Sequence, residues 1–373
     1  MVADWFGFEC RDIFKERYMI KHIVQIIPAL GYGGAERMVI DLINNSDSTK
    51  YRFTVIVFFD NLPLKALIKN KTEVILVEKK SKYDIGFLNR LENKLAELKP
   101  DLIHGHLFAG DFWGRLAAHH LNVPFLSTEH NLNYEDGWFK NYIKRIISTK
   151  QDYYVACSLA VSDYMRDVYK ISSDIAVINN GIDLNRFINL PPAIFQEPLK
   201  FLMVGRLVKQ KGHLVVLKAL NNLKSFSWSL IIVGSGEEKN NLLEFVKTNN
   251  LGERVLFIDP TTQIEKLYSE ADILLMPSVW EGLGVVVMEA MASGRLVVAS
   301  KTGGLIEIIR NNETGYFGAS NNVLNWEEKI RYFFENKKNI QTVVKSAKVY
   351  AQENFGIDKM TDKYNKVYSM IIK

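Results

Sequence analysis

The chain has 373 residues, of which 47% are hydrophobic and 24% are charged, and this is enough for more than one hydrophobic core, so we expect two domains. Cys10 and Cys157 are too few for a disulfide framework and have no zinc-like spacing with histidine, which indicates a reducing, cytoplasmic setting. Although the formal net charge is +5, basic and acidic residues number 24 and 23 in residues 1–190 and 23 and 19 in the remainder, so neither half has the basic excess of a nucleic-acid-binding protein.

Residues 1–18 precede the first predicted strand, and we interpret them as an extension that takes no part in the fold. No stretch approaches the roughly 20 consecutive apolar residues that a membrane-spanning helix needs. The first residues also lack the basic start and long apolar run of a secretion signal. We therefore expect a cytoplasmic protein.

Short apolar runs alternate with amphipathic helical stretches from residue 19 to about residue 180. This alternation predicts a parallel sheet with helices on both faces. The predicted strands are His22–Ile27, Phe53–Phe59, Glu73–Val77, Asp101–His104, Val123–Thr128 and Tyr153–Cys157. We assign residues 19–190 to a first Rossmann-like domain.

A proline-containing connection at residues 189–193 separates this pattern from a second one. The second set of predicted strands is Leu199–Val204, Ser227–Val233, Arg254–Ile258, Asp272–Met276 and Arg295–Ala299. We assign residues 191–355 to a second Rossmann-like domain and residues 356–373 to a closing helix that returns toward the first. Because such sheets bind ligands beyond the carboxyl ends of their strands, two facing domains create a cleft lined by both sets of loops.

The first strand runs into a glycine-rich turn, residues 28–37, that opens a helix. Glycines let backbone amides approach a ligand closely, and the N-terminal end of a helix attracts phosphate. The turn departs from the dinucleotide fingerprint G-x-G-x-x-G, because Glu36 stands where the last glycine should pack. This departure argues against a nicotinamide-dependent oxidoreductase. For this loop alone, a tight turn without a ligand remains the alternative.

Two basic residues follow the first strand of the second domain. Arg206 and Lys211 lie between the end of that strand and a helix that begins near His213. A guanidinium binds phosphate with paired donors, and an ammonium adds a point charge. Together they would neutralise a diphosphate leaving group, and the alternative is a solvated basic loop.

The most specific pattern covers residues 276–294, where a strand ends, a loop turns and an apolar helix begins near Gly284. Glu281 lies in the loop and Glu289 about a turn and a half along the helix, so one carboxylate can face a sugar while the other reaches a ribose diol. The helix amides between them suit a diphosphate. The alternative is that both carboxylates are exposed charges at a helix end.

From residue 19 to its C terminus, the chain resembles the retaining family 4 glycosyltransferases, which have the two-domain GT-B fold. The motifs that carry this resemblance occur in the family's order along the chain. They are Gly33-Gly34-Ala35-Glu36, Thr128-Glu129-His130, Asn179-Asn180-Gly181-Ile182-Asp183, Gly205-Arg206 with Lys211-Gly212, Val233-Gly234-Ser235-Gly236, and the pair Glu281 and Glu289.

The resemblance implies a role for each matching residue. Arg206 and Lys211 would contact the diphosphate, Glu281 the transferred sugar, Glu289 the ribose, and His130 the sugar hydroxyls near the reacting carbon. The residues expected in catalysis are His130, Arg206, Lys211 and Glu281. Those expected to bind the donor are Gly33, Gly34, Arg206, Lys211, Glu281, Gly282, Leu283, Gly284, Val285 and Glu289.

The resemblance further implies an enzyme that transfers a sugar, with retention, from a UDP- or GDP-sugar to a glycan or lipid-linked glycan in surface polysaccharide biosynthesis. The nucleotide sugar is a substrate, and no cofactor is expected. Residues 257–261 depart from the family at the turn around the nucleobase, so the base stays open. A nucleotide-sugar-binding protein without turnover is the alternative, and the complete set of expected catalytic residues argues against it.

We expect no metal, because the sequence has no Asp-x-Asp motif and basic residues already stand where the diphosphate would lie. The nearest mimic, Glu270-Ala-Asp272, directly precedes a strand, which favours a role in the fold. His104, His106 and His130 offer an alternative metal site, although lining of the cleft explains the first two as well.

Residues 138–147 carry apolar side chains at helical spacing, with cations on the other faces. Such a stripe is more typical of a helix packed onto its own sheet, and this is our interpretation. The alternative is a helix that lies on a membrane surface, which would make the protein peripheral on the inner face of the cell membrane.

Overall fold

The computed structural model describes residues 20–372 with the exception of residues 70, 82 and 136. The extension expected at residues 1–18 and Cys10 lie outside the described residues. Within the described part of the chain, no helix is both long enough and apolar enough to cross a membrane.

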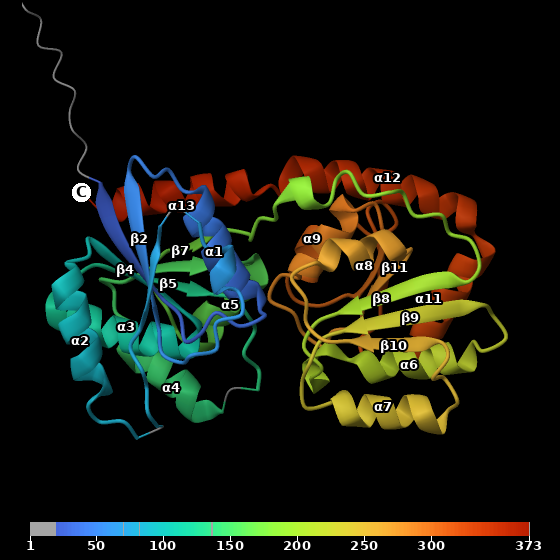
Figure 1. Cartoon of the computed structure of the whole chain (residues 1–373), viewed down its shortest axis with the longest axis horizontal. Coiled ribbons are helices and arrows are strands. Elements are labelled where there is room, and N and C mark those ends of the chain that lie inside the picture. The colour runs from blue at the N-terminus through green and yellow to red at the C-terminus, as the bar shows by residue number, and fades with distance from the viewer. Residues whose placement is uncertain (1–19, 70, 82, 136, 373) are drawn as a thin grey trace, which may run out of the picture.

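Two domains lie side by side, each built on one parallel sheet (Figure 1). The first sheet has the strand order β3-β2-β1-β4-β5-β6-β7, and the second has the order β10-β9-β8-β11-β12-β13. The strands are β1 (Lys21–Ile26), β2 (Tyr51–Val57), β3 (Glu73–Leu76), β4 (Leu102–His106), β5 (Phe125–Glu129), β6 (Tyr153–Ala156), β7 (Ile175–Val177), β8 (Leu199–Val204), β9 (Trp228–Val233), β10 (Val255–Ile258), β11 (Ile273–Met276), β12 (Leu296–Ser300) and β13 (Tyr316–Gly318). The predicted pair of Rossmann-like domains is thereby confirmed.

Helices cover both faces of each sheet, and the central strands β1, β4, β11 and β12 are therefore buried along almost all of their length. The helices are α1 (Gly34–Asn45), α2 (Phe87–Leu98), α3 (Leu107–Leu121), α4 (Trp138–Ile147), α5 (Leu159–Val168), α6 (His213–Asn222), α7 (Lys239–Thr248), α8 (Ile264–Glu270), α9 (Val285–Ala292), α10 (Leu305–Ile308), α11 (Val323–Glu335), α12 (Lys337–Asn354) and α13 (Ile357–Ile371). In both sheets the strand order reverses at the centre, between β1 and β4 and between β8 and β11. Doubly wound sheets bind their ligands at this point.

Every strand predicted from the sequence overlaps a strand of the structure. The prediction missed β7 and β13, which have three residues each and lie at the edges of their sheets. Runs this short are too brief to show a periodic pattern of apolar residues.

The chain crosses between the domains twice, and the two crossings are hydrogen-bonded to each other. The Ile182 amide donates to the Phe355 carbonyl (2.8 Å), and the Ile357 amide donates to the Ile182 carbonyl (3.1 Å). Gly181 allows this close approach, because a Cβ at that position would lie 2.6 Å from the Ile357 Cα. The motif at residues 179–183 therefore forms the junction between the domains.

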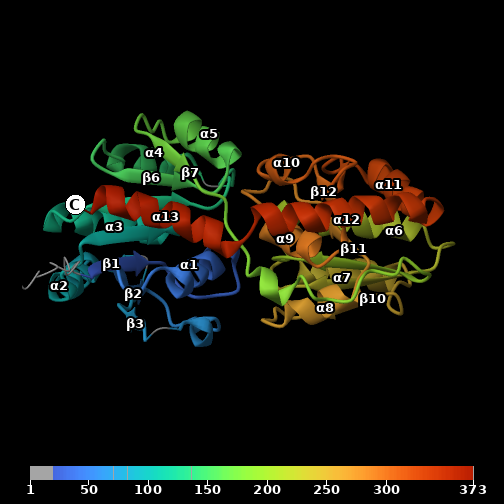
Figure 2. The same ribbon diagram turned by 90° about the horizontal axis from the view of Figure 1, so that it is seen from above.

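The last two helices run along the whole molecule, with α12 over the second domain and α13 over the first (Figure 2). The α13 side chains Met360, Tyr364, Tyr368 and Ile371 are buried in the core of the first domain. This confirms the prediction that the C-terminal helix returns to the first domain.

Candidate active site

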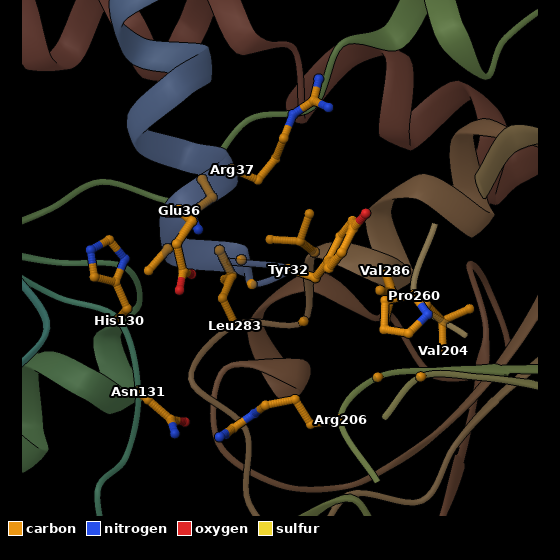
Figure 3. A pocket seen from close by; sticks show the side chains of 18 of the residues that line it. Tyr32, Glu36, Arg37, His130, Asn131, Val204, Arg206, Pro260, Leu283 and Val286 are labelled. Atoms are coloured by element: carbon orange, nitrogen blue, oxygen red, sulfur yellow. The ribbon is translucent and has the colours of Figure 1, made fainter. Parts of the chain in front are cut away.

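A cavity of about 560 Å³ lies between the two domains, at the carboxyl ends of both sheets (Figure 3). It brings together residues that are far apart in the sequence. The expected site residues that line it are Gly33, Gly34, His130, Arg206, Lys211, Glu281, Leu283, Gly284, Val285 and Glu289. Gly282 instead faces the first domain, where a Cβ on it would lie 2.3 Å from the His130 carbonyl oxygen.

The glycine-rich turn after β1 places the N-terminal end of α1 at the cavity. Gly33 caps the helix and, as a glycine, provides no side-chain hydrogen bond to its first turn. Gly34 has open space where a Cβ would stand, so a ligand can approach its backbone. The amides at the start of the helix and the helix dipole make this end of α1 suited to an anion.

The basic residues after β8 line the opposite side of the cavity. The Lys211 ammonium lies 2.5 Å from a Glu281 carboxylate oxygen, and the Ser278 hydroxyl donates to the same oxygen (3.2 Å). The Arg206 guanidinium is more exposed and donates to the Gln210 side chain (3.2 Å). An anion between these groups would meet a free guanidinium face and an ammonium already held in place by a carboxylate.

The helix α9 begins at Gly284, whose φ of +96° is accessible to glycine far more easily than to other residues. This turn directs the first amides of α9 at the cavity and places Glu289 one helical turn further along. Glu289 is half-buried, and the Tyr268 hydroxyl lies 3.0 Å from its carboxylate. Burial raises the pKa of Glu289 to about 7, so this carboxyl group changes charge near neutral pH.

His130 lies at the end of β5, and its ring edge is turned toward Glu36 of α1 (Figure 3). Its Nε2 is 3.1 Å from Nδ1 of His106, which lies behind it at the end of β4. Burial lowers the pKa of His130 to about 3, helped by the nearby Lys144 ammonium, so the ring is neutral at physiological pH. A neutral ring can bind a hydroxyl but supplies no positive charge.

The three histidines considered as a metal site do lie together, with ring centroids 4.0 Å apart for His104 and His106 and 5.3 Å apart for His106 and His130. Apart from the His130 Nδ1, their nitrogens are hydrogen-bonded to one another and to Gln25, Thr128 and Tyr368 rather than converging on one point. Among the described residues, no group of three or more histidine, cysteine and acidic side chains has the arrangement of a metal site.

The helix α4 differs from its sequence interpretation. Trp138, Phe139, Tyr142 and Ile146 are 52 to 78% exposed, so the prediction that this apolar stripe packs onto the sheet is wrong. The side turned inward carries Lys144, which forms a buried ion pair with Glu129 next to His130. An unpaired buried carboxylate is costly, so this ion pair sets which face of the helix turns inward.

Hydrogen bonds also join the two domains directly. The Ser158 hydroxyl donates to the Gly282 carbonyl (2.6 Å). Glu307 of the second domain accepts hydrogen bonds from the Leu159 and Ala160 amides (2.9 Å each) and so caps the first turn of α5 in the first domain. These contacts hold the two walls of the cavity against each other.

Sequence analysis missed several residues of the site. Glu36 was considered only as a departure from a glycine fingerprint, yet its carboxylate lines the cavity, and burial raises its pKa. Asn131 and Arg186 also line the cavity, and Glu307 and Ser158 form hydrogen bonds between the domains. A position shortly after a predicted strand was the available signal for Asn131 and Ser158. Glu36, Arg186 and Glu307 are brought to the site by the packing of the two domains.

The fold and this cleft define the class of the molecule. Residues 32–186 match the family model for Glycosyltransferase Family 4, and residues 187–350 match the model for Glycosyl transferases group 1. A glycosyltransferase from Rickettsia africae has 26% sequence identity and a TM-score of 0.80, with 95% of this chain and 100% of that one covered. The molecule is thus a two-domain protein of the GT-B class. More particularly, the chain belongs to the family 4 glycosyltransferases.

Two relatives and a further structure show how widely the resemblance extends. An uncharacterized glycosyltransferase of Methanocaldococcus jannaschii is 30% identical over 254 residues, which make up 60% of this chain and 64% of that protein. The UDP-Gal:alpha-D-GlcNAc-diphosphoundecaprenol alpha-1,3-galactosyltransferase of Escherichia coli is 27% identical over 312 residues, or 76% of this chain and 79% of that enzyme. HepE of Anabaena, solved in complex with UDP and glucose, has the same fold with a TM-score of 0.83, 20% identity, and coverage of 94% and 100%.

Proposed function

We propose that the protein is a retaining glycosyltransferase that moves a sugar from a nucleoside-diphosphate sugar to a hydroxyl of a glycan or lipid-linked glycan without a metal ion. The observation that carries this proposal is the composition of the cavity between the domains. There, Arg206 and the Lys211–Glu281 pair of the second domain lie opposite His130 and the start of α1 in the first.

In the reaction, the bond between the anomeric carbon and the diphosphate oxygen breaks, and an acceptor oxygen forms a bond to the same carbon. The acceptor hydroxyl attacks from the face that the diphosphate leaves, and its proton passes to the departing phosphate oxygen. Negative charge grows on that oxygen, and fixed positive groups stabilise it without reorganising. Arg206, Lys211 and the amides at the start of α9 have this role.

A UDP-sugar is the donor that the relatives support first. The Escherichia coli relative is named for UDP-galactose, and HepE has been solved with UDP and glucose. In this chain, Pro260, Thr261 and Thr262 line the end of the cavity beyond β10, where a base would lie if the diphosphate rests between Arg206 and α9.

An acceptor hydroxyl would bind on the first-domain side, at Glu36. The carboxylate projects from the first turn of α1 into the space between His130 and Leu283 (Figure 3). Among the described residues, it has no cation within ion-pairing distance, whereas Glu129 and Glu281 are each paired with a lysine. A carboxylate without a cation accepts hydrogen bonds from a hydroxyl readily.

A lipid-linked acceptor is supported by α4. Its exposed aromatic side chains, Trp138, Phe139 and Tyr142, lie on the same helix as the exposed cation Arg145. This combination suits the interface of an anionic membrane. The helix is also close to the cavity, because the Lys140 ammonium lies 5.5 Å from the ring centroid of Phe108, a lining residue.

The test is transfer and donor hydrolysis with a panel of UDP- and GDP-sugars, in the presence and absence of excess chelator. We expect turnover of at least one donor, unaffected by the chelator, and an anomeric configuration in the product, read by NMR, that matches the donor. Binding of a donor without turnover, in the presence of glycan and lipid-linked acceptors, would instead identify a nucleotide-sugar-binding protein. Loss of activity in chelator that magnesium restores would contradict the metal-independent mechanism, and an inverted product would contradict retention.

A further inference from the structure

A chain of buried hydrogen bonds runs from His130 to the C-terminal helix. The His130 Nε2 is 3.1 Å from Nδ1 of His106, and the His106 Nε2 is 2.6 Å from the Gln25 side-chain oxygen. The Gln25 amide nitrogen then donates to the Tyr368 hydroxyl of α13 (3.0 Å). The cavity wall is thus joined to the last helix of the chain through side chains alone.

The chain continues beyond α13 and returns to β5. The Tyr368 hydroxyl is 2.9 Å from the His104 Nδ1, and the His104 Nε2 is 2.7 Å from the Thr128 hydroxyl. Thr128 in turn lies 3.3 Å from the Tyr364 hydroxyl, one turn earlier on α13. Tyr364 is therefore the last residue of this hydrogen-bonded chain, and all its remaining residues lie between Tyr364 and His130.

All the members between His130 and Tyr364 are buried, so water cannot replace a lost partner. Burial holds the pKa values of His104 and His106 well below their usual range. Each of these rings is therefore neutral, with one nitrogen that donates and one that accepts. In such a chain, the direction of one hydrogen bond fixes the direction of the next.

The Gln25 amide sets that direction. Its oxygen faces His106 and can only accept, so the proton of His106 is on Nε2 and the lone pair is on Nδ1. The Nε2 of His130 must then be the donor, which leaves a lone pair on the His130 Nδ1. This Nδ1 atom is buried and has no hydrogen-bond partner among the residues that the structure describes.

We propose that His106, Gln25 and Tyr368 are positioning residues, which fix the proton of His130 on Nε2 so that its Nδ1 accepts a hydrogen bond from a sugar hydroxyl in the cavity. The inference rests on the proposed function for the identity of that ligand, whereas the position of the proton does not depend on it. Turning the Gln25 amide would reverse every bond in the chain and present a donor at Nδ1 instead. In the observed direction the Tyr368 hydroxyl of α13 accepts the Gln25 amide proton, and this bond connects α13 to the position of the proton on His130.

The first test is the tautomer itself, read from ¹⁵N-labelled histidine in the full-length protein by NMR. The signals of His130 and His106 are assigned by their loss in the His130→Asn and His106→Asn variants. We expect His130 to carry its proton on Nε2 in the wild-type protein. A proton on Nδ1 would overturn the proposal whether or not the enzyme turns over any donor.

The second test compares two substitutions on the same helix. Tyr368→Phe keeps the buried ring but frees the Gln25 amide, and we expect a mixture of His130 tautomers and a kcat lowered by about tenfold. The matched control is Tyr364→Phe, which removes the same hydroxyl at the end of the hydrogen-bonded chain remote from His130. It should leave the His130 tautomer and kcat unchanged. Gln25→Met, which breaks the chain without involving α13, should behave as Tyr368→Phe does.

A purely structural role gives a different result. Because UDP lacks the transferred sugar, its Kd should stay within about twofold in Tyr368→Phe, and the Tm of this variant should equal that of Tyr364→Phe. If the two tyrosine variants lower kcat equally, or if UDP affinity falls together with kcat, the positioning role is wrong. If the wild-type protein neither turns over any nucleotide sugar nor binds UDP, the proposed function fails, and the tautomer measurement still decides the position of the proton.

Discussion

Arg206 lies at the edge of the cavity, and its guanidinium contacts Gln210 rather than a carboxylate. It is therefore available to a diphosphate whose negative charge grows as the glycosidic bond breaks. We expect Arg206→Ala to lower kcat by about 10²-fold or more, because a charged donor aimed at such an oxyanion is worth roughly 3 kcal/mol. The KM for the donor should change less. Steady-state kinetics give both values, and Lys209→Ala, an exposed cation in the same loop, is the control. An increase in KM alone would assign Arg206 to ground-state binding.

Glu36 projects into the cavity from the acceptor side without a cation of its own. The Glu36→Gln variant keeps the shape of the side chain but makes a weaker acceptor for a hydroxyl proton. We expect the KM for the acceptor to rise by about tenfold, with donor hydrolysis in the absence of acceptor unchanged, since one charged hydrogen bond is lost. Equal losses in hydrolysis and transfer would place Glu36 at the donor instead.

Glu289 should make donor binding depend on pH. Burial raises its pKa to about 7, so the group is mostly neutral below that pH and mostly a carboxylate above it. Ribose hydroxyls donate more strongly to the carboxylate, and the affinity for a UDP-sugar should therefore increase by up to about tenfold between about pH 6 and pH 8. Calorimetry with a UDP-sugar measures this, because its diphosphate does not titrate in the range. The Glu289→Gln variant should show a flat profile, and an unchanged slope in that variant would assign the titration to another group.

The sequence predicted the second-domain side of the site better than the first-domain side. Glu281 and Glu289 are separated by one loop and one helical turn, so their spacing alone predicts that both face the cavity. Glu36 and Gln25 have no such signal. Their positions depend on how α1 meets the other domain and how α13 meets the sheet, and these contacts join residues up to 343 positions apart.

At the scale of elements, α4 shows where a periodic pattern is insufficient. The spacing of its apolar residues predicts a helix correctly, but this spacing does not indicate whether the apolar side faces the sheet or the solvent. The buried Lys144–Glu129 pair turns the opposite face inward and leaves the aromatic side chains exposed. The same ion pair connects this exposed helix to Glu129, which directly precedes His130. A partner that binds to α4 would therefore bind close to the active site.

We expect the protein to bind anionic phosphatidylglycerol vesicles at low salt and to bind zwitterionic vesicles weakly. Replacing Trp138 and Phe139 together by alanine should weaken vesicle binding at least about tenfold, because two large apolar side chains no longer insert. Sedimentation with vesicles measures the bound fraction. The control is Leu324→Ala, an exposed apolar residue on α11 in the second domain. Equal vesicle binding by the double variant would contradict binding to a membrane through α4. Full activity on a soluble acceptor without any vesicle binding would contradict a role for the membrane altogether.

At the scale of the whole molecule, the two segments that cross between the domains are hydrogen-bonded to each other at Ile182. A Cβ at Gly181 would lie 2.6 Å from the Ile357 Cα and 2.9 Å from the Gly356 oxygen, and both are backbone atoms that cannot rotate away. We expect Gly181→Ala to lower the free energy of unfolding by about 1–3 kcal/mol, as overpacking does, with a lower Tm in calorimetry. Gly252→Ala, at a position with nothing within 4 Å, should leave the Tm unchanged. If both variants have the same Tm, the crossing tolerates the extra atom.

The packing of α13 also has a consequence for the order of events during synthesis. The first domain emerges first from the ribosome, and domains generally fold in that order. Its core, however, contains Met360, Tyr364, Tyr368 and Ile371, and its buried Gln25 and His104 each find one of their hydrogen-bond partners in Tyr368 of α13. Until α13 is made, the nascent first domain has an apolar groove without its helix, and Gln25 and His104 each lack one hydrogen-bond partner. The second domain can meanwhile complete its own sheet, so the part of the protein that begins translation is the part that finishes folding last.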